Sequence, residues 1–414
     1  MKNSGIEWIG RIPDSWQLVN IGNVLKEYKN ENKLLDTHAL QFKYGTIVPK
    51  KETNTSQEVL EILSKYNVVK PNIIMVNGLN LAFDFVTQRV ALVKENGVIT
   101  STYIALLPQN LVVSQYATYV LKSYDFQKVF HSLGRGLRCM LSYDILRREK
   151  MPLPSLDEQK SIVNCLEQKL AEVDKLIEVQ QAQIEKLKEY KQSVITEAVT
   201  KGLDLTAPMK DSGVEWIGKI PEDWETIRVK QLLNERIERS LTGQEEPLSM
   251  SQKVGLVPTR MLDSIPNMAS SFIGAKLTYV DDLVFNKLKA HLGVFSVSKY
   301  DGLVSPDYAV YYSTGKINLK YLEYLFKTPQ CILEFRKRST GIAVGLTRLY
   351  TDGLFAIECP FPNHSSQMEI VAYLDDKCAK IDKLIELKQS KIEKLQEYKK
   401  SLIYEYVTGK KEVI

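Results

Sequence analysis

The chain has 414 residues, of which 55 are basic and 50 acidic, so its formal net charge at pH 7 is only +5. Hydrophobic residues make up 44% and charged residues 25%, as in ordinary globular proteins, and no apolar run approaches the ~20 residues that a membrane helix needs. This charge permits nucleic-acid binding without demanding it, and the opening residues lack the apolar core of a secretion signal. We therefore expect two or three domains and a cytoplasmic protein.

The chain opens with a segment that returns later. Residues 3–16 read NSGIEWIGRIPDSW and residues 211–224 read DSGVEWIGKIPEDW, which aligns Trp8 with Trp216 (216 − 8 = 208). A longer repeat begins at Met151 and Cys359 with the same offset (359 − 151 = 208). The segments between the repeats diverge. This order predicts globular domains at residues 1–150 and 209–358 and helical segments at 151–208 and 359–414. Because the tryptophans occur in both copies, we expect them to pack rather than to read a sequence.

Each divergent segment combines short strand-like runs with helical ones. Residues 72–76, 283–285 and 308–312 are rich in β-branched and aromatic residues, as in buried strands, whereas residues 319–326 have the pattern of a short helix. The fold class that follows is α+β, with two similar mixed α/β domains.

The repeated segments have the pattern of long helices. Apolar residues recur at spacings of four and three over 155–200, with interruptions at Gln180 and Lys191, and the second copy is interrupted at Lys388 and Lys399. Since one such helix cannot bury its apolar seam alone, we predict an antiparallel coiled-coil pair with pseudo-two-fold symmetry. A generic dimerisation coiled coil is the alternative. The predicted seam consists of Leu166, Leu170, Val173, Ile177, Ile184, Leu187, Leu374, Ile381, Ile385, Ile392 and Leu395.

Most candidate DNA contacts lie in polar, glycine-containing loops near the end of each divergent segment, and Lys287 and Lys289 form a further basic stretch. Glycine allows close approach of the backbone to a phosphate, and arginine can bond guanine with two hydrogen bonds. A solvated turn is the alternative for any one of these residues. The candidates are Arg135, Arg138, Lys287, Lys289, Arg338, Thr347 and Arg348.

The sequence offers no catalytic constellation. It lacks a GxxxxGK[ST] phosphate loop, an Asn-Pro-Pro-aromatic tetrad and any nucleophile–base pair, so we expect no catalytic residues. Its five cysteines are scattered singly, which argues against a disulfide framework and against a metal site.

In its repeated IGxIPxxW openings and the PLPSLDEQ segment that begins a long helix at residues 151–159, the chain resembles the specificity subunit of type I restriction–modification systems. The second copy, CPFPNHSSQ at 359–367, keeps the prolines and Gln367 but loses the acidic pair. The resemblance implies two target-recognition domains that read a bipartite, asymmetric site in double-stranded DNA.

The resemblance also implies partners. Two methyltransferase subunits would dock on the helices and restriction (translocase) subunits could join, so S-adenosylmethionine, ATP and Mg would belong to those partners and this chain would hold no cofactor. Two other interpretations are a coiled-coil scaffold unrelated to DNA and the recognition part of a single-chain restriction–methylation enzyme.

Overall fold

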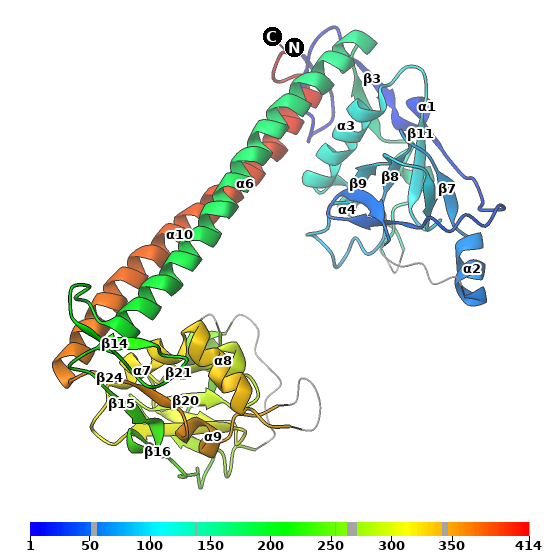
Figure 1. The fold of residues 1–414 in the computed structure, drawn as a ribbon. Helices are drawn as coiled ribbons and strands as arrows, with labels where there is room; N and C mark the ends of the chain where they lie inside the picture. Colours follow the sequence, from blue (N-terminus) through cyan, green and yellow to red (C-terminus); the bar gives the residue numbers. More distant parts are fainter. Residues whose placement is uncertain (51–55, 137–138, 253, 263–270, 342–346, 414) are drawn as a thin grey trace. The chain divides into compact units, whose positions relative to one another are not determined.

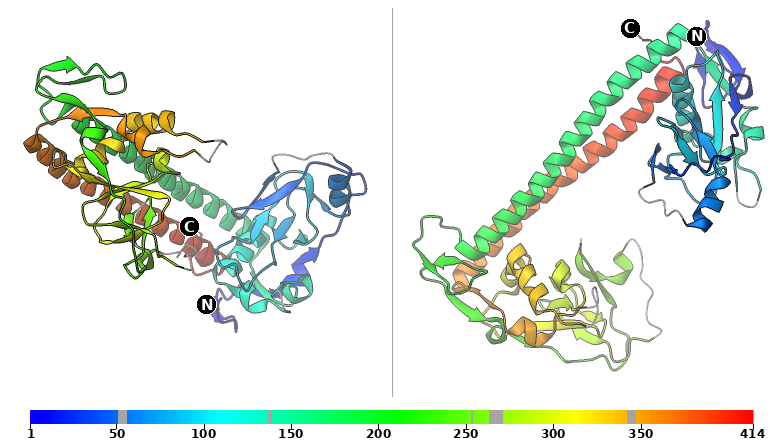
Figure 2. Two further views of the ribbon diagram at one scale, coloured as in Figure 1. Left: turned by 90° about the horizontal axis from the view of Figure 1, so that it is seen from below. Right: turned by 45° about the vertical axis from the view of Figure 1, so that its right-hand side comes forward.

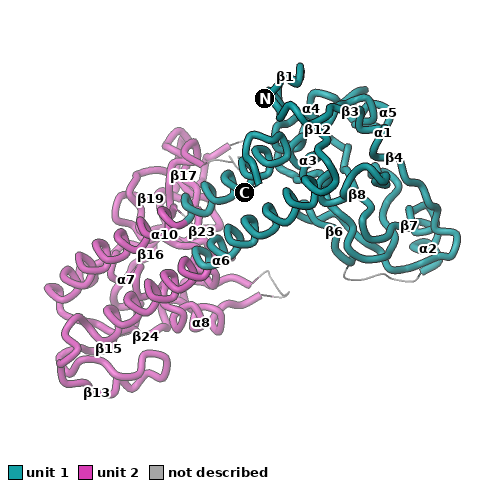
Figure 3. The backbone as a smooth tube through the Cα atoms, turned by 90° about the horizontal axis from the view of Figure 1, so that it is seen from above, with its two compact units in different colours: residues 1–181, 389–414 teal, residues 182–388 magenta. Residues whose placement is uncertain are grey.

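The computed structural model describes residues 1–50, 56–136, 139–252, 254–262, 271–341 and 347–413. The chain divides into two compact units, unit 1 with residues 1–181 and 389–414 and unit 2 with residues 182–388 (Figure 3). Each unit combines one globular domain with about half of each long helix, which is a different division from the four consecutive segments expected from the sequence. The four-segment division stays a prediction.

The long helices are α6 (Leu156–Lys201) and α10 (His364–Val407). The other elements of unit 1 are β1 (Lys2–Asn3), β2 (Arg11–Ile12), β3 (Gln17–Asn20), α1 (Ile21–Val24), β4 (Leu25–Glu27), β5 (Leu40–Lys43), β6 (Thr46–Pro49), α2 (Gln57–Ser64), β7 (Asn67–Val69), β8 (Ile74–Val76), β9 (Val90–Leu92), β10 (Gly97–Ile99), β11 (Ile104–Pro108), α3 (Ser114–Phe126), α4 (Val129–Leu133), α5 (Tyr143–Leu146) and β12 (Lys150–Leu153).

The other elements of unit 2 are β13 (Met209–Asp211), β14 (Lys219–Pro221), β15 (Glu225–Arg228), η1 (Val229–Gln231), β16 (Leu233–Glu235), β17 (Leu248–Ser251), β18 (Gly255–Pro258), η2 (Thr259–Met261), β19 (Lys276–Thr278), β20 (Leu283–Asn286), η3 (Ala290–Leu292), β21 (Phe295–Val297), β22 (Gly302–Val304), β23 (Tyr308–Ser313), α7 (Leu319–Phe326), α8 (Pro329–Arg338), α9 (Thr351–Phe355) and β24 (Glu358–Phe361).

The two globular domains share one topology (Figures 1 and 2). Each has a four-stranded antiparallel sheet, ordered β4-β11-β8-β9 in unit 1 and β16-β23-β20-β21 in unit 2. The two-stranded pairs also correspond, with β3–β12 matching β15–β24 and β7–β10 matching β19–β22. The central strands read Ile-Met-Val and Leu-Val-Phe and are buried on both faces, because α3 or α7 covers one face and further strands the other. The α+β class with two similar domains is thus confirmed.

In unit 1 the beginning of α6 packs against the end of α10. Leu166, Leu170 and Val173 share one apolar cluster with Leu402 and Tyr406 of α10, so the two helices are antiparallel. In unit 2 the relationship is reversed, since the end of α6 packs with the beginning of α10. That cluster contains Ile195, Ala198 and Val199 of α6 and Ile370, Leu374 and Cys378 of α10.

All eleven predicted seam residues are shielded from solvent to some degree. Seven of them are buried, and Ile177, Leu187, Ile385 and Leu395 are half-buried. The polar interruptions of the seam make contacts between the helices. Lys191 Nζ lies 2.6 Å from a carboxylate oxygen of Asp382 in unit 2, and Lys399 pairs with Asp174 in unit 1. Both partners of these two pairs are related by the offset of 208 (382 − 174 = 208 and 399 − 191 = 208), as an isologous contact requires.

Each domain is attached to both helices through a buried tyrosine. The Tyr116 hydroxyl lies 3.1 Å from the Pro152 carbonyl and 3.4 Å from the Val407 carbonyl at the end of α10. Tyr321 repeats this arrangement with Pro360 and with Val199 at the end of α6. Burial raises the pKa of both phenols well above the ordinary value, so each remains a hydrogen-bond donor.

Trp16 and Trp224, from the repeated segments, pack against the glycines that follow the long helices. Gly202 and Gly409, which follow the helices, have φ of +78° and +68°, the left-handed conformation that glycine adopts without strain. A Cβ on Gly409 would lie 2.3 Å from Pro13 Cδ and 3.2 Å from the Trp16 ring, and a Cβ on Gly202 would lie 3.3 Å from the Trp224 ring. Packing is therefore the role that the structure gives Trp16 and Trp224.

Candidate nucleic-acid interface

The candidate residues of unit 1 lie at the end of the sheet where β8 connects to β9. We call the described parts of two segments, residues 77–89 and 134–141, the unit 1 tip. Leu141 N donates to the Gly78 carbonyl at 2.9 Å, and Leu81 N donates to the Cys139 carbonyl at 3.2 Å, so the segments lie side by side. Gly78 is needed for this approach, because a Cβ there would lie 2.6 Å from the Leu141 carbonyl oxygen.

Arg135 is exposed on this tip. Its backbone pairs with that of Met140 through two hydrogen bonds of 3.0 Å, which hold the glycine-containing turn closed. The neighbouring candidate, Arg138, falls outside the described residues.

The unit 2 tip is built in the same way from the described parts of residues 286–294 and 340–349. Leu349 N donates to the Lys287 carbonyl at 3.0 Å, and the backbones of Thr340 and Arg348 pair through hydrogen bonds of 3.0 and 2.8 Å. Lys287 therefore lies near Thr347 and Arg348, although it is far from them in sequence.

The cations of this tip differ in solvent exposure and in their ion pairs. Lys289 is exposed, whereas Lys287 is half-buried, and desolvation followed by the charge of Lys276 lowers its pKa. Arg348 lies 3.6 Å from the Asp307 carboxylate, and its buried Nε has no hydrogen-bond partner among the described residues. Thr347 is half-buried.

Arg338 ends α8 just before this tip, and its guanidinium pairs with Glu334 one turn earlier. Lys337 also pairs with Glu334, at 2.8 Å. The cations in the last turn of α8 stabilise the helix dipole, so Arg338 has a structural use that the sequence did not suggest. Its charge is the least available of the unit 2 candidates.

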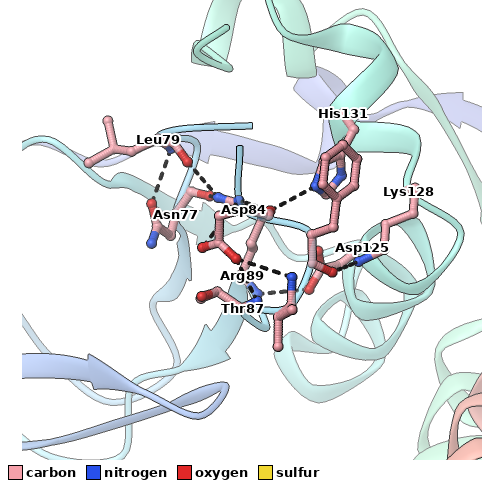
Figure 4. Close-up of polar contacts among 10 residues, drawn as sticks. Asn77, Leu79, Asp84, Thr87, Arg89, Asp125, Lys128 and His131 are labelled. Carbon is pink, nitrogen blue, oxygen red and sulfur yellow. Dashed lines mark hydrogen bonds and ion pairs between the residues drawn. The ribbon is translucent and has the colours of Figure 1, made fainter. Parts of the chain in front are cut away.

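One segment of the unit 1 tip was missed by the sequence analysis. Residues 77–89 form a loop around Arg89 (Figure 4), whose side chain is fully buried. They expose Phe83 and Val86 to solvent. Two exposed apolar side chains beside an arginine, between two strand-like runs, were the available signal. Periodicity could not reveal it, because the contacts of Arg89 follow no helix or strand spacing.

The tips are one place where the two domains differ. The hairpin pair Val76–Val90 encloses residues 77–89, and the equivalent pair Phe285–Phe295 encloses residues 286–294, which is 13 residues against 9. Unit 1 exposes Phe83, Val86 and Arg135 there, whereas unit 2 exposes Leu292 and Lys289 and holds Lys287 and Arg348 half-buried. Two copies of one scaffold thus carry different surfaces at equivalent positions.

Comparison with known proteins shows what the chain resembles. Residues 13–189 match the family model for the type I restriction modification DNA specificity domain. Over 402 residues the chain is 24% identical to the type I restriction enzyme MjaVIII specificity subunit of Methanocaldococcus jannaschii, which covers 92% of this chain and 89% of that protein. The chain is thus similar to the specificity subunits of type I restriction–modification systems, in its first half by the family model and along most of its length by the relative.

Other proteins are similar over a shorter stretch or in fold. The putative type I restriction enzyme MjaX specificity subunit of the same organism is 25% identical over 263 residues, which is 60% of this chain and 59% of that protein. A chain solved in a study of complex assembly and conformational transition of the type I R-M system superposes with a TM-score of 0.70 at 14% identity, covering 96% of this chain and 98% of that one. The HsdS subunit from Thermoanaerobacter tengcongensis superposes with a TM-score of 0.52 at 16% identity, covering 99% and 100%.

Two further observations concern the described residues only. None of the helices in this part of the chain is long and apolar enough to cross a membrane. Within the same residues, no three His, Cys, Asp or Glu side chains gather in an arrangement that could hold a metal ion.

Proposed function

We propose that this chain is the sequence-specific DNA-binding subunit of a type I restriction–modification complex. The unit 1 tip reads one half of a bipartite asymmetric site, and the unit 2 tip reads the other half. The observation that carries the proposal is the contrast between two domains of identical strand topology and tips of different length and chemistry. A scaffold unrelated to DNA gives no reason for that contrast.

The repeated helices supply the surface for partners. Leu176, Leu384 and Leu387 are about half exposed on α6 and α10, outside the seam that the helices bury together. We propose that two methyltransferase subunits dock on equivalent surfaces of the two repeats, and that restriction subunits join them. S-adenosylmethionine, ATP and Mg would belong to these partners.

A binding experiment tests this function. Methylated adenines mapped across the host genome give both half-sites and the spacer between them. The chain assembled with its methyltransferase subunits should then bind a duplex carrying that site at least ~10³-fold more tightly than random DNA, and affinity should fall steeply from 50 to 200 mM salt. Equal, salt-insensitive affinity for both duplexes would favour a scaffold instead.

A second experiment concerns catalysis. We propose that the chain alone neither methylates nor cleaves DNA and does not hydrolyse ATP. The assay uses purified chain in which mass spectrometry detects no partner subunit. Robust methylation by such a sample would favour the single-chain enzyme interpretation.

A further inference from the structure

The loop of residues 77–89 in unit 1 is held by one buried arginine. Arg89 has no exposed surface, and its guanidinium donates hydrogen bonds to the carbonyls of Asn77, Leu79 and Asp84 at 3.2, 2.6 and 2.6 Å. Its backbone N–H donates to the buried carboxylate of Asp125 at 2.7 Å. The buried Nε of Arg89 has no hydrogen-bond partner among the described residues, so these three bonds to carbonyls offset only part of the cost of burying the guanidinium, and they tie the loop to it.

Further contacts hold the second half of the loop. The Asp84 carboxylate accepts the N–H groups of Val86 and Thr87 at 3.1 and 2.9 Å. The Phe85 ring stacks on His131 with the ring centres 4.7 Å apart, and Lys128 Nζ donates to the Phe85 carbonyl at 2.6 Å. Figure 4 shows these side chains converging on the loop from α3, α4 and the turn between them.

This loop exposes two apolar side chains to solvent. Phe83 is 83% exposed and Val86 is 91% exposed, so neither stabilises the fold appreciably. The acidic groups nearby are engaged within the loop, Asp84 with backbone N–H groups and Asp125 with Arg89, whereas Arg135 is exposed on the adjoining segment. An ordered apolar surface beside a cation suits a DNA groove, in which base edges lie between phosphates.

The width of the tip favours the major groove. Two hydrogen-bonded segments lie ~5 Å apart, so a tip made of two segments and their side chains exceeds the ~6 Å minor groove and fits the ~12 Å major groove. The apolar group on base edges in the major groove is the thymine methyl. We propose that Phe83 and Val86, on the loop clamped by Arg89, read a T·A pair in the half-site of unit 1 through the thymine methyl group.

This inference rests on the proposed function, and the test pairs a change in the DNA with a change in the protein. The probe is a synthetic duplex with the mapped site, in which each thymine of the unit 1 half-site is replaced in turn by uracil, which lacks the methyl group. For the complete complex, one such replacement should weaken binding about fourfold, the effect of one buried methyl. Phe83→Ala and Val86→Ala should each weaken binding to the unmodified duplex about four- to tenfold.

The two changes should not add. In the Phe83→Ala or Val86→Ala complex the sensitive uracil replacement should cost less than twofold, because the contact is already gone. Leu111→Ala is the matched control, since Leu111 is 60% exposed in the same unit but precedes α3 at its other end. Leu111→Ala should leave both the affinity and its sensitivity to uracil unchanged. Uracil in the other half-site should weaken binding equally in the wild-type and alanine complexes.

The outcomes separate the inference from the function. A half-site in which no uracil replacement weakens binding, or additive effects of uracil and alanine, would overturn the role of Phe83 and Val86 while leaving DNA recognition intact. A wild-type complex that does not distinguish the mapped site from random DNA would overturn the proposed function itself.

Discussion

Residues 1–208 contain one domain and one complete long helix, and the structure predicts that this fragment pairs with a second copy of itself. In the intact chain, unit 1 is completed by the end of α10, where Leu402, Ile403, Tyr406 and Val407 are at most 4% exposed. A fully buried side chain of this kind contributes ~1.5–3 kcal/mol, so four of them contribute ~6–12 kcal/mol. This is comparable to the whole stability of a typical domain, ~5–15 kcal/mol, so a monomeric fragment should not keep unit 1 folded.

The partner fragment offers the equivalent part of α6 in place of α10. At the offset of 208, Val194, Ile195, Ala198 and Val199 replace the four residues above, and the Val199 carbonyl replaces that of Val407 as acceptor for Tyr116. The largest difference is alanine in place of Tyr406, a loss of ~3–5 kcal/mol by analogy with other aromatic-to-alanine changes in cores. The fragment dimer should therefore form but be underpacked at two symmetric places.

Ala198→Tyr in the 1–208 fragment should repair this defect. Dimerisation is measured by light scattering, and thermal unfolding is measured at one protein concentration, because the Tm of a dimer depends on it. A gain of ~3 kcal/mol corresponds to a rise in Tm of roughly 6–12 °C at this size. Ala171→Tyr, at an exposed position of α6, is the control and should change little.

With methyltransferase partners, the paired fragments should recognise an inverted repeat of the unit 1 half-site. Fragment 209–414 should do the same with the other half-site, but Tyr406 in place of Ala198 would overpack unit 2. A monomeric 1–208 fragment that unfolds cooperatively would refute the reasoning, as would a dimer that still prefers the asymmetric site. The packing argument fails if Ala198→Tyr gains no more than Ala171→Tyr.

Three further predictions follow from the helices and the unit 1 tip. One heptad inserted after Gln180 and one after Lys388 keeps the seam in phase and lengthens the helix pair by ~10 Å. Methylome mapping should then show intact half-sites with a spacer changed by about three base pairs, or binding should be lost. An unchanged spacer at full affinity would show that the helices do not set the distance between the half-sites. Gln367 is fully buried; its side chain accepts the Asn318 N–H at 2.7 Å and donates to the Pro362 carbonyl at 2.9 Å. Gln367→Leu should therefore lower the free energy of unfolding, measured by urea denaturation, by ~3–5 kcal/mol. Gln396→Leu, at an exposed position of α10, is the control and should change it little. Hydrogen bonds from Thr87 lower the pKa of Asp84 from 3.8 to about 2. The ionised carboxylate therefore stabilises the fold above about pH 4, and this contribution is lost as the pH falls toward 2. The difference in free energy of unfolding between wild type and Asp84→Asn should shrink over that range, and a difference independent of pH would contradict this reasoning.

The helices and the repeat were predictable because they leave a periodic record in the sequence. The helix expected over 155–200 is Leu156–Lys201, and the short helix expected at 319–326 is α7 (Leu319–Phe326). The strand expected at 72–76 is shorter, Ile74–Val76, since Asn72 has a φ of +73° and belongs to a turn. Local pattern was sufficient wherever neighbours in sequence are also neighbours in space.

The contacts that shape the tips were not predictable in this way. Arg89 binds Asp125, which lies 36 residues away, through a backbone N–H that carries no sequence signature. Similarly, the Glu158 carboxylate at the beginning of α6 accepts the Trp16 indole N–H at 2.7 Å, 142 residues away. Such pairs require the tertiary fold, which a single sequence without an alignment does not reveal.

The composition of unit 1 has a consequence for biosynthesis. Its two parts, residues 1–181 and 389–414, are separated by the 207 residues of unit 2 (388 − 181 = 207), which form one uninterrupted stretch. At ~5–20 residues per second, a ribosome needs roughly 10–40 s to translate that stretch. Throughout this interval the apolar face of Leu166, Leu170 and Val173 is made but lacks its final cover, so the second domain can mature before the first. Two nascent chains on one polysome could meanwhile exchange these surfaces, which makes the rate of translation a determinant of correct assembly.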